Sequence, residues 1–167
     1  MSLTQINLKP YWDENTIDRM DVKIKITGLS YKEGERLCSM QLSTVTIPGC
    51  EPNALQICDE SGAVLVKESE ETPYPYHWRR WNGTEGNVKI NYTVYPREIK
   101  PTDICGPYFD FRAEKGGANS AGFSFLMDIE KAEECELSWD MSAMPEKSRG
   151  VCTLGEHKVK AKTLDRL

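Results

Sequence analysis

Hydrophobic and polar residues alternate along several stretches of this chain. The clearest runs are VKIKITGL at residues 22–29, NVKINYTV at 87–94, CELSW at 135–139 and KVKAK at 158–162. Because successive side chains of a β-strand point to opposite faces, each run predicts a strand with one buried face and one face in water. This pattern is typical of antiparallel sheets.

Other stretches predict the connections. LQICDESGAVLV, residues 55–66, predicts a hairpin that turns at Asp59–Gly62, and the glycine-rich AEKGGANSA, residues 113–121, predicts a hairpin loop. The acidic ESEETPYP, residues 68–75, predicts a connecting loop. AGFSFLM, residues 121–127, predicts a strand buried on both faces, and DIEKAEE, residues 128–134, predicts a short helix with Asp128 as its N-cap.

These elements predict an all-β fold. We expect about ten strands, little helix and two antiparallel sheets packed as a β-sandwich, because a single sheet of this length would leave one face uncovered. The length of 167 residues fits one domain over residues 1–167, with a core large enough to be stable.

The charge argues against nucleic acid as a partner. The chain has 21 Lys and Arg against 26 Asp and Glu, a net charge of −5, whereas binding to a phosphate backbone needs a positive field. No run of eighteen apolar residues occurs, so we expect no membrane span. The N-terminus has no basic segment followed by an apolar one, which predicts a cytoplasmic protein, with a removed secretory leader as the alternative.

The residue types that carry chemistry do not form recognisable motifs. The six cysteines form no Cys-x-x-Cys pair, which argues against a zinc ribbon, and their apolar surroundings favour buried thiols over disulfides. The two histidines, His77 and His157, lie outside any His-Glu-x-x-His spacing, and no Gly-x-Ser-x-Gly elbow is present. We therefore expect no catalytic, cofactor-binding or metal-binding residue in this chain.

One aromatic and basic stretch, HWRRWNGTEGNVKINYTVYP at residues 77–96, allows two interpretations. Its tryptophans and arginines could stack on bases or sugar rings. Alternatively, the stretch is two neighbouring strands joined by a turn at Asn82–Gly86. The acidic total favours the structural interpretation.

The same region carries a resemblance to a known family. WRRWNGTEGNVKINYTVYPRE, followed by GPYFDF, a glycine-rich stretch and GFSFLM, is similar to the N-terminal β domain of glycyl aminopeptidase-type zinc metallopeptidases, which belong to the thermolysin-like clan. The tail KVKAKTLDRL is similar to the strand that precedes the catalytic domain in that family. The resemblance covers roughly the last ninety residues, and the first seventy match only as alternating strands.

The resemblance implies a supporting role. The chain would be the N-terminal accessory domain of a longer zinc aminopeptidase-like protein, with the catalytic domain of the same polypeptide as its partner and a peptide substrate in the cleft between them. The family's zinc histidines and catalytic glutamate have no counterpart here, so zinc is expected only in that catalytic domain.

Two surfaces follow from the two functional hypotheses. The accessory domain would contact its partner through Trp12, Tyr74, Tyr76 and Trp78, which have loop-like flanks. The alternative is a free-standing β-sandwich module that binds carbohydrate or peptide on a platform of Tyr74, Tyr76, Trp78 and Trp81.

Overall fold

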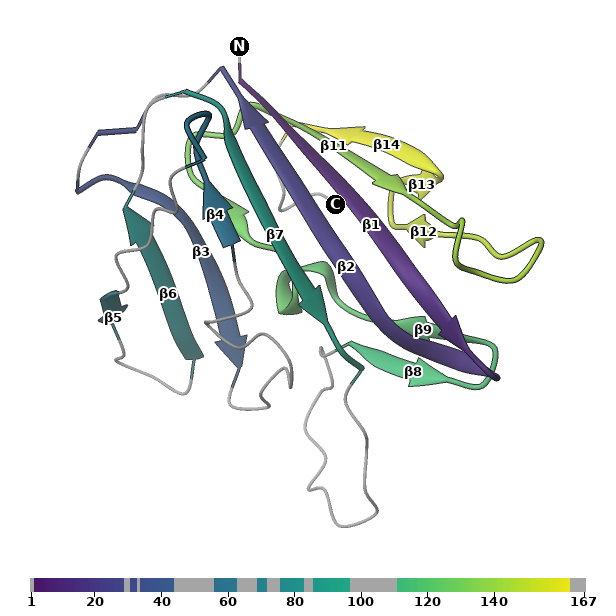
Figure 1. Ribbon diagram of the computed structural model, residues 1–167. Helices are drawn as coiled ribbons and strands as arrows, with labels where there is room; N and C mark the ends of the chain where they lie inside the picture. Colours follow the sequence, from purple (N-terminus) through teal and green to yellow (C-terminus); the bar gives the residue numbers. More distant parts are fainter. Residues whose placement is uncertain are drawn as a thin grey trace.

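The structure, a computed structural model, describes residues 2–28, 31–32, 34–43, 56–62, 69–71, 76–82, 86–96 and 111–162. These residues form two main sheets and two small hairpins (Figure 1). The larger sheet has the strand order β14 (Lys158–Ala161), β11 (Glu134–Trp139), β1 (Leu3–Asp13), β2 (Thr16–Thr27), β7 (Val88–Val94) and β4 (Gln56–Cys58). The smaller sheet has the order β10 (Asp128–Ile129), β3 (Arg36–Ser43), β6 (Tyr76–Asn82) and β5 (Ser69–Glu71).

The predicted all-β class is confirmed. The described residues form fourteen strands rather than about ten, because seven of them are pieces of only two or three residues. The two small hairpins are β8 (Arg112–Glu114) with β9 (Gly117–Asn119), and β12 (Val151–Cys152) with β13 (Gly155–Glu156). The predicted hairpin within residues 113–121 is thus confirmed, with Gly116 in the left-handed conformation that its turn requires.

The alternating runs bury the residues that their pattern predicts. Val22, Ile24 and Ile26 of β2 are almost fully buried, and they lie opposite Tyr92, Ile90 and Val88 of β7, respectively. The apolar residues of β1, β7 and β11 point to the same side, while their polar neighbours face away from the core. Burial of these alternate residues is the main favourable contribution to the fold.

The larger sheet is mixed, which corrects the expectation of purely antiparallel sheets. β1 pairs with β2 antiparallel, but it pairs with β11 parallel, from Leu3 opposite Glu134 to Leu8 opposite Trp139. Parallel neighbours need a long crossover connection, and here that connection is most of the chain. Periodicity within one strand carries no information about the direction of its neighbour, so the sequence pattern could not distinguish the two arrangements.

The two main sheets share one hydrophobic core. Leu37 and Cys38 of β3 and Ile129 of β10 belong to the same buried cluster as Ile24 of β2 and Ile90 of β7. In Figure 1, β1, β2 and β7 run side by side through the centre, and β3, β5 and β6 lie to their left.

The sequence suggested that the two strands on either side of Asn82–Gly86 are neighbours in one sheet, and the structure corrects this. β6 pairs with β3 in the smaller sheet, and β7 pairs with β2 in the larger one.

The helix predicted at residues 128–134 is wrong. Asp128 and Ile129 form β10, which pairs with Ser39 and Cys38, and Lys131 has a positive φ of 63° that interrupts any helix. Seven residues are too few to hold a helix on propensity alone, so pairing to β3 and burial of Ile129 decide the conformation.

The strand predicted at residues 121–127 is also wrong. Gly122–Ser124 form a short 3₁₀ helix, η2, in which the N–H of Phe125 donates to the carbonyl of Gly122. The predicted burial is correct for the second half, because Ser124, Phe125, Leu126 and Met127 are all buried. A run of consecutive buried residues fits a compact turn as well as a strand, and periodicity cannot separate them.

Two further predictions are confirmed in part. The turn at Asp59–Gly62 is present, with the N–H of Gly62 donating to the carbonyl of Asp59, but β4 before it pairs with β7, and the strand expected after it lies outside the described residues. Residues 69–71 of the expected loop at 68–75 form β5, and residues 72–75 lie outside the described part of the chain.

Cys38 and Cys135 are buried, as expected. Cys58 and Cys152 form no disulfide but are only half-buried, and Cys50 and Cys105 lie outside the described residues. Burial raises the pKa of the Cys38 thiol, which keeps it protonated and unreactive. Among the residues that the structure describes, no helix is long and apolar enough to cross a membrane.

Candidate functional site

The face of the larger sheet that points away from the core carries two rows of polar side chains. Strand register sets the first row, in which Gln5 lies between Glu136 of β11 and Lys25 of β2, and Lys25 lies opposite Lys89 of β7. The second row lies two residues further along the strands. Across β11, β1, β2 and β7, it consists of Ser138, Asn7, Lys23 and Asn91. We call this surface the outer face.

A shallow open hollow of about 430 Å³ lies over these rows. Its charged lining comprises four lysines and one glutamate, namely Lys23, Lys25, Lys89, Lys158 and Glu136. Its neutral polar lining is Gln5, Asn7, Asn91 and Ser138. The hollow thus has a net positive charge of three, although the whole chain has a net charge of −5.

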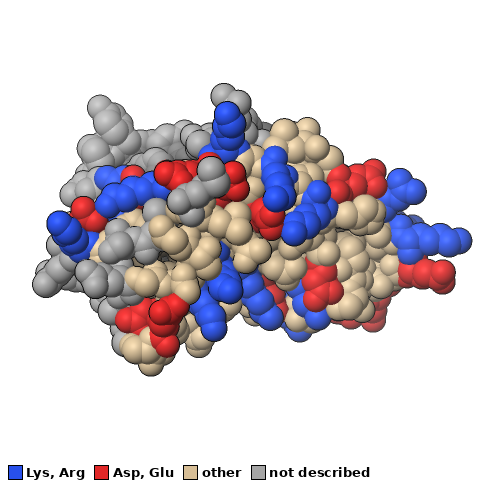
Figure 2. All heavy atoms as spheres, turned by 90° about the horizontal axis from the view of Figure 1, so that it is seen from above, with Lys and Arg blue, Asp and Glu red and all other residues tan. Residues whose placement is uncertain are grey.

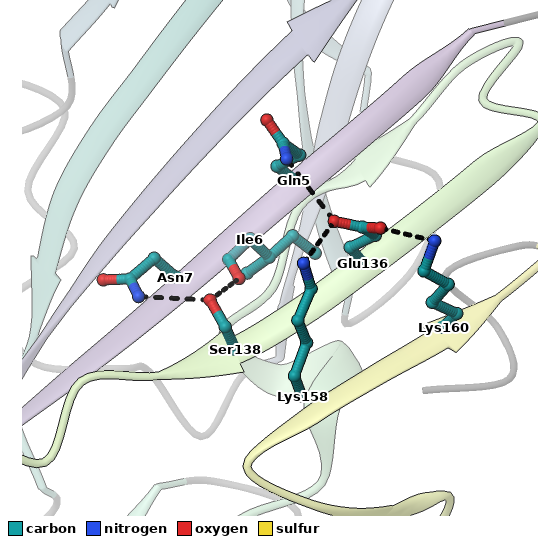
Figure 3. A network of polar contacts seen from close by, with 7 residues as sticks. All are labelled: Gln5, Ile6, Asn7, Glu136, Ser138, Lys158 and Lys160. Carbon is teal, nitrogen blue, oxygen red and sulfur yellow. Dashed lines mark hydrogen bonds and ion pairs between the residues drawn. The ribbon is translucent and has the colours of Figure 1, made fainter.

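Glu136 is held at one side of the hollow by two lysines of the edge strand β14. Its Oε1 lies 2.7 Å from Nζ of Lys160, its Oε2 lies 3.0 Å from Nζ of Lys158, and the amide of Gln5 donates to Oε2 at 3.4 Å (Figure 3). The hydrogen bonds from Lys160, Lys158 and Gln5 lower the pKa of Glu136 to about 2. Because the carboxylate stays ionised at neutral pH and is already paired, it is unsuited to act as a general acid or base.

Ser138 and Asn7 connect the same two strands one step further along. The amide of Asn7 donates to Oγ of Ser138 at 3.2 Å, and Oγ of Ser138 donates to the carbonyl of Ile6 at 3.2 Å (Figure 3). These bonds link the parallel pair β1 and β11 through side chains as well as backbone, which fixes the floor of the hollow.

Beyond the end of the hollow at Asn7 and Ser138, acidic side chains are paired with basic or hydrogen-bonding side chains. Nζ of Lys9 lies 3.2 Å from Oδ2 of Asp140, and Asp21 accepts hydrogen bonds from Tyr11 and Thr93. The bonds from Ser142 and Lys9 lower the pKa of Asp140 to about 2. The positive excess is therefore confined to the hollow and does not extend over the whole outer face.

Three of the lysines in the hollow lack an acidic partner within the described residues. Lys23, Lys25 and Lys89 are exposed, and none of them forms an ion pair there, whereas Lys158 and Lys160 share Glu136. We call Lys23, Lys25 and Lys89 the lysine trio. Elsewhere the charges are mixed: Figure 2 shows basic and acidic side chains interspersed over the end of the molecule seen from above.

The aromatic residues singled out from the sequence lie in different sheets. Trp12 is in β1 of the larger sheet, where its half-buried ring packs against the core and its Nε1 donates to the carbonyl of Glu14 at 3.1 Å. Tyr76, Trp78 and Trp81 are in β6 of the smaller sheet, and Tyr74 lies outside the described residues. The structure does not bring Trp12 into the same sheet as the other three.

Of the two histidines, His77 lies in β6 and His157 lies in the exposed link between β13 and β14. Within the described residues, no group of three or more His, Cys, Asp or Glu is arranged to hold a metal ion.

The lysine trio was missed by sequence reasoning, although its residues were recognised as the polar half of two alternating runs. The missing information is the register that places Lys25 opposite Lys89. A partial signal was present, because the first run carries lysine at two successive outward positions, Lys23 and Lys25, and the second run carries Lys89 at its first outward position.

Comparison with known proteins gives a similarity of fold. No family model matches the chain, and no curated protein matches it in sequence. Among solved structures, an aminopeptidase N family protein from Idiomarina loihiensis matches with a TM-score of 0.50 and 15% sequence identity. That match covers 100% of this chain and 28% of the other, so the chain spans less than a third of the protein whose fold it shares in part.

An M1 zinc metallopeptidase from Deinococcus radiodurans gives a weaker match. Its TM-score is 0.31 at 12% identity, over 95% of this chain and 37% of that one. A score of this size adds no support of its own. The similarity to the Idiomarina loihiensis protein shows a shared β fold, and at 15% identity it shows the fold alone.

Proposed function

We propose that this chain is a non-catalytic accessory domain, N-terminal in position, that packs against the catalytic domain of a zinc aminopeptidase-like metallopeptidase. One observation carries the proposal. The whole chain matches only 28% of an aminopeptidase N family protein, as a domain within a larger enzyme would.

Zinc and catalysis belong, in this proposal, to the domain that this chain supports. The accessory domain would wall one side of the substrate cleft, where the partner holds the peptide. Trp12, Tyr74, Tyr76 and Trp78 are the residues proposed to contact that partner, with those of β6 forming one group and Trp12 of β1 a separate one.

The test begins with the coding sequence beyond the codon for Leu167. We expect it to continue into a region that encodes His-Glu-x-x-His and a downstream glutamate. A reading frame that stops at this point, with no such region encoded beside it, would contradict the proposal.

The second step measures the effect of this domain on the enzyme. The full-length protein should hydrolyse aminoacyl p-nitroanilides, and the catalytic region expressed without residues 1–167 should lose activity or solubility. Hydrogen exchange of β6 amides should slow in the full-length protein relative to the isolated chain. Unchanged exchange in β6 would exclude this strand from the interface.

A further inference from the structure

We propose that the hollow on the outer face binds an acidic segment of a partner polypeptide in extended conformation. This inference rests on the charge and register of the larger sheet, and it stands whether or not the accessory-domain proposal holds. The binding residues are the lysine trio, with Gln5, Asn7 and Asn91 as neutral polar neighbours.

The first argument is an electrostatic cost inside the sheet. Lys25 lies directly opposite Lys89 in the antiparallel pair of β2 and β7, and Lys23 lies two residues before Lys25 on the same face of β2. Like charges directly opposite each other destabilise a sheet. No carboxylate of the described residues forms an ion pair with Lys25 or Lys89, so an acidic ligand bound beside them would relieve this repulsion.

The second argument is the spacing of the ammonium groups. Residues two apart on a strand are separated by roughly 6.6 Å, at about 3.3 Å per residue. An extended peptide with carboxylates at alternate positions repeats at the same interval. Such a peptide, lying along β2, could place one carboxylate near Lys23 and the next between Lys25 and Lys89.

The third argument is the polar character of the rest of the hollow. Asn91 makes no side-chain hydrogen bond within the described residues, and its amide offers both a donor and an acceptor. The backbone of an extended peptide presents both kinds of group. The hollow can therefore bond to the main chain of a peptide as well as to its carboxylates.

A peptide fits this site better than a nucleic acid does. Glu136 lines the hollow with a carboxylate that remains ionised, and it would repel a phosphate placed beside Lys158. The net charge of −5 would also repel a long polyanion, whereas a short peptide interacts mainly with charges within a Debye length of about 8 Å.

The experiment measures peptide affinity by isothermal titration calorimetry at 50 mM salt. It uses three capped heptapeptides that contain Glu or Gln at chosen positions and Ser at the others. The first has Glu at positions 2, 4 and 6, the second has three consecutive Glu, and the third has Gln in place of each Glu of the first. We expect the alternating Glu peptide to bind at least fivefold more tightly than the consecutive one, and the Gln peptide not to bind. A tenfold loss of affinity is expected between 50 and 500 mM salt.

The variant that tests the site is Lys23→Gln, Lys25→Gln and Lys89→Gln combined. Its matched control also replaces three exposed lysines by Gln, and it changes the net charge by the same amount. These lysines lie outside the hollow and are Lys32, Lys115 and Lys147. We expect at least a tenfold loss of affinity in the first and less than a twofold loss in the second. Circular dichroism should show that both remain folded, since all six side chains are exposed.

Three outcomes would overturn the proposal. Equal losses in the two triple variants would show that only the total charge matters. Failure of the alternating peptide to bind at millimolar concentration would show that the hollow takes no acidic peptide. Tighter binding of a ten-residue oligothymidylate than of the peptide, lost in the first variant, would assign the hollow to nucleic acid instead.

Discussion

Glu136 is an acidic residue whose carboxylate is held by donors from two neighbouring strands of the larger sheet, β1 and β14. It lies on the face away from the core, yet it is only 8% exposed, because Lys158, Lys160 and Gln5 surround its carboxylate. Three such bonds stabilise the ionised carboxylate more in the folded protein than water does in the unfolded chain. This difference links the protonation of Glu136 to folding.

The linkage gives a pH dependence with a definite sign. The pKa of Glu136 falls from 4.5 to about 2 on folding, so its contribution to stability is present above pH 4.5 and is lost as the pH falls toward 2. We expect Glu136→Gln to be less stable than the parent at pH 7, and its free energy of unfolding to decrease less between pH 5 and pH 2. Urea unfolding at several pH values measures both.

The exposed Glu146, which forms no ion pair within the described residues, supplies the control for that experiment. Glu146→Gln should follow the parent over the whole pH range. If Glu136→Gln and Glu146→Gln lose stability in parallel with acid, the pairing of Glu136 with β14 does not contribute as described. Asp140 accounts for part of the remaining acid sensitivity, since its pKa is also lowered to about 2.

At the scale of the elements, β2 and β7 combine a strongly buried face with an unfavourably charged one. Ile24 and Ile90 pair across the strands on the core side, while Lys25 and Lys89 pair on the outer face. Burial of the apolar side chains outweighs the repulsion, because each contributes roughly 1.5–3 kcal/mol whereas a like-charge pair costs less than 1 kcal/mol.

This balance predicts that loss of one charge stabilises the free protein. Lys25→Gln should raise the free energy of unfolding by about 0.2–1 kcal/mol at low salt, since it removes the repulsion with Lys89. The gain should shrink as salt screens the parent's charges. Lys115→Gln, in the exposed turn of the β8–β9 hairpin, should show neither effect, and a salt-independent gain in Lys25→Gln would point to a cause other than charge.

The sequence predicted well what depends on one strand and poorly what depends on two. Alternation identified the buried residues of β2, β7, β11 and β14, and glycine placed the β8–β9 turn. It could not place β6 and β7 in different sheets, or predict that Gly122–Ser124 form η2 and not a strand, because pairing partners and local compaction are decided by distant residues. The lysine trio was missed for the same reason, because it depends on the register between β2 and β7.

At the scale of the whole molecule, the two sheets should unfold together because they share one core. Leu37 of β3 and Ile24 of β2 belong to a single buried cluster and are at most 2% exposed. Leu37→Ala and Ile24→Ala should each cost about 2–5 kcal/mol and shift one common transition. Urea unfolding followed by far-ultraviolet circular dichroism and by tryptophan fluorescence should give coincident curves in both variants. Separate transitions in Leu37→Ala would mean that the smaller sheet unfolds alone.

The parallel pairing of β1 with β11 has a consequence for the growing chain on the ribosome. Partners such as Gln5 and Glu136 are 131 residues apart, so β1 is synthesised early and must wait for its neighbour. At about 5–20 residues per second, that delay is roughly 7–26 s. During this time one edge of β1 has no strand to pair with, and unpaired edges invite association between chains. β1 is thus made well before its pairing can be completed, and this strand of the nascent chain needs protection until residues 134–139 have emerged.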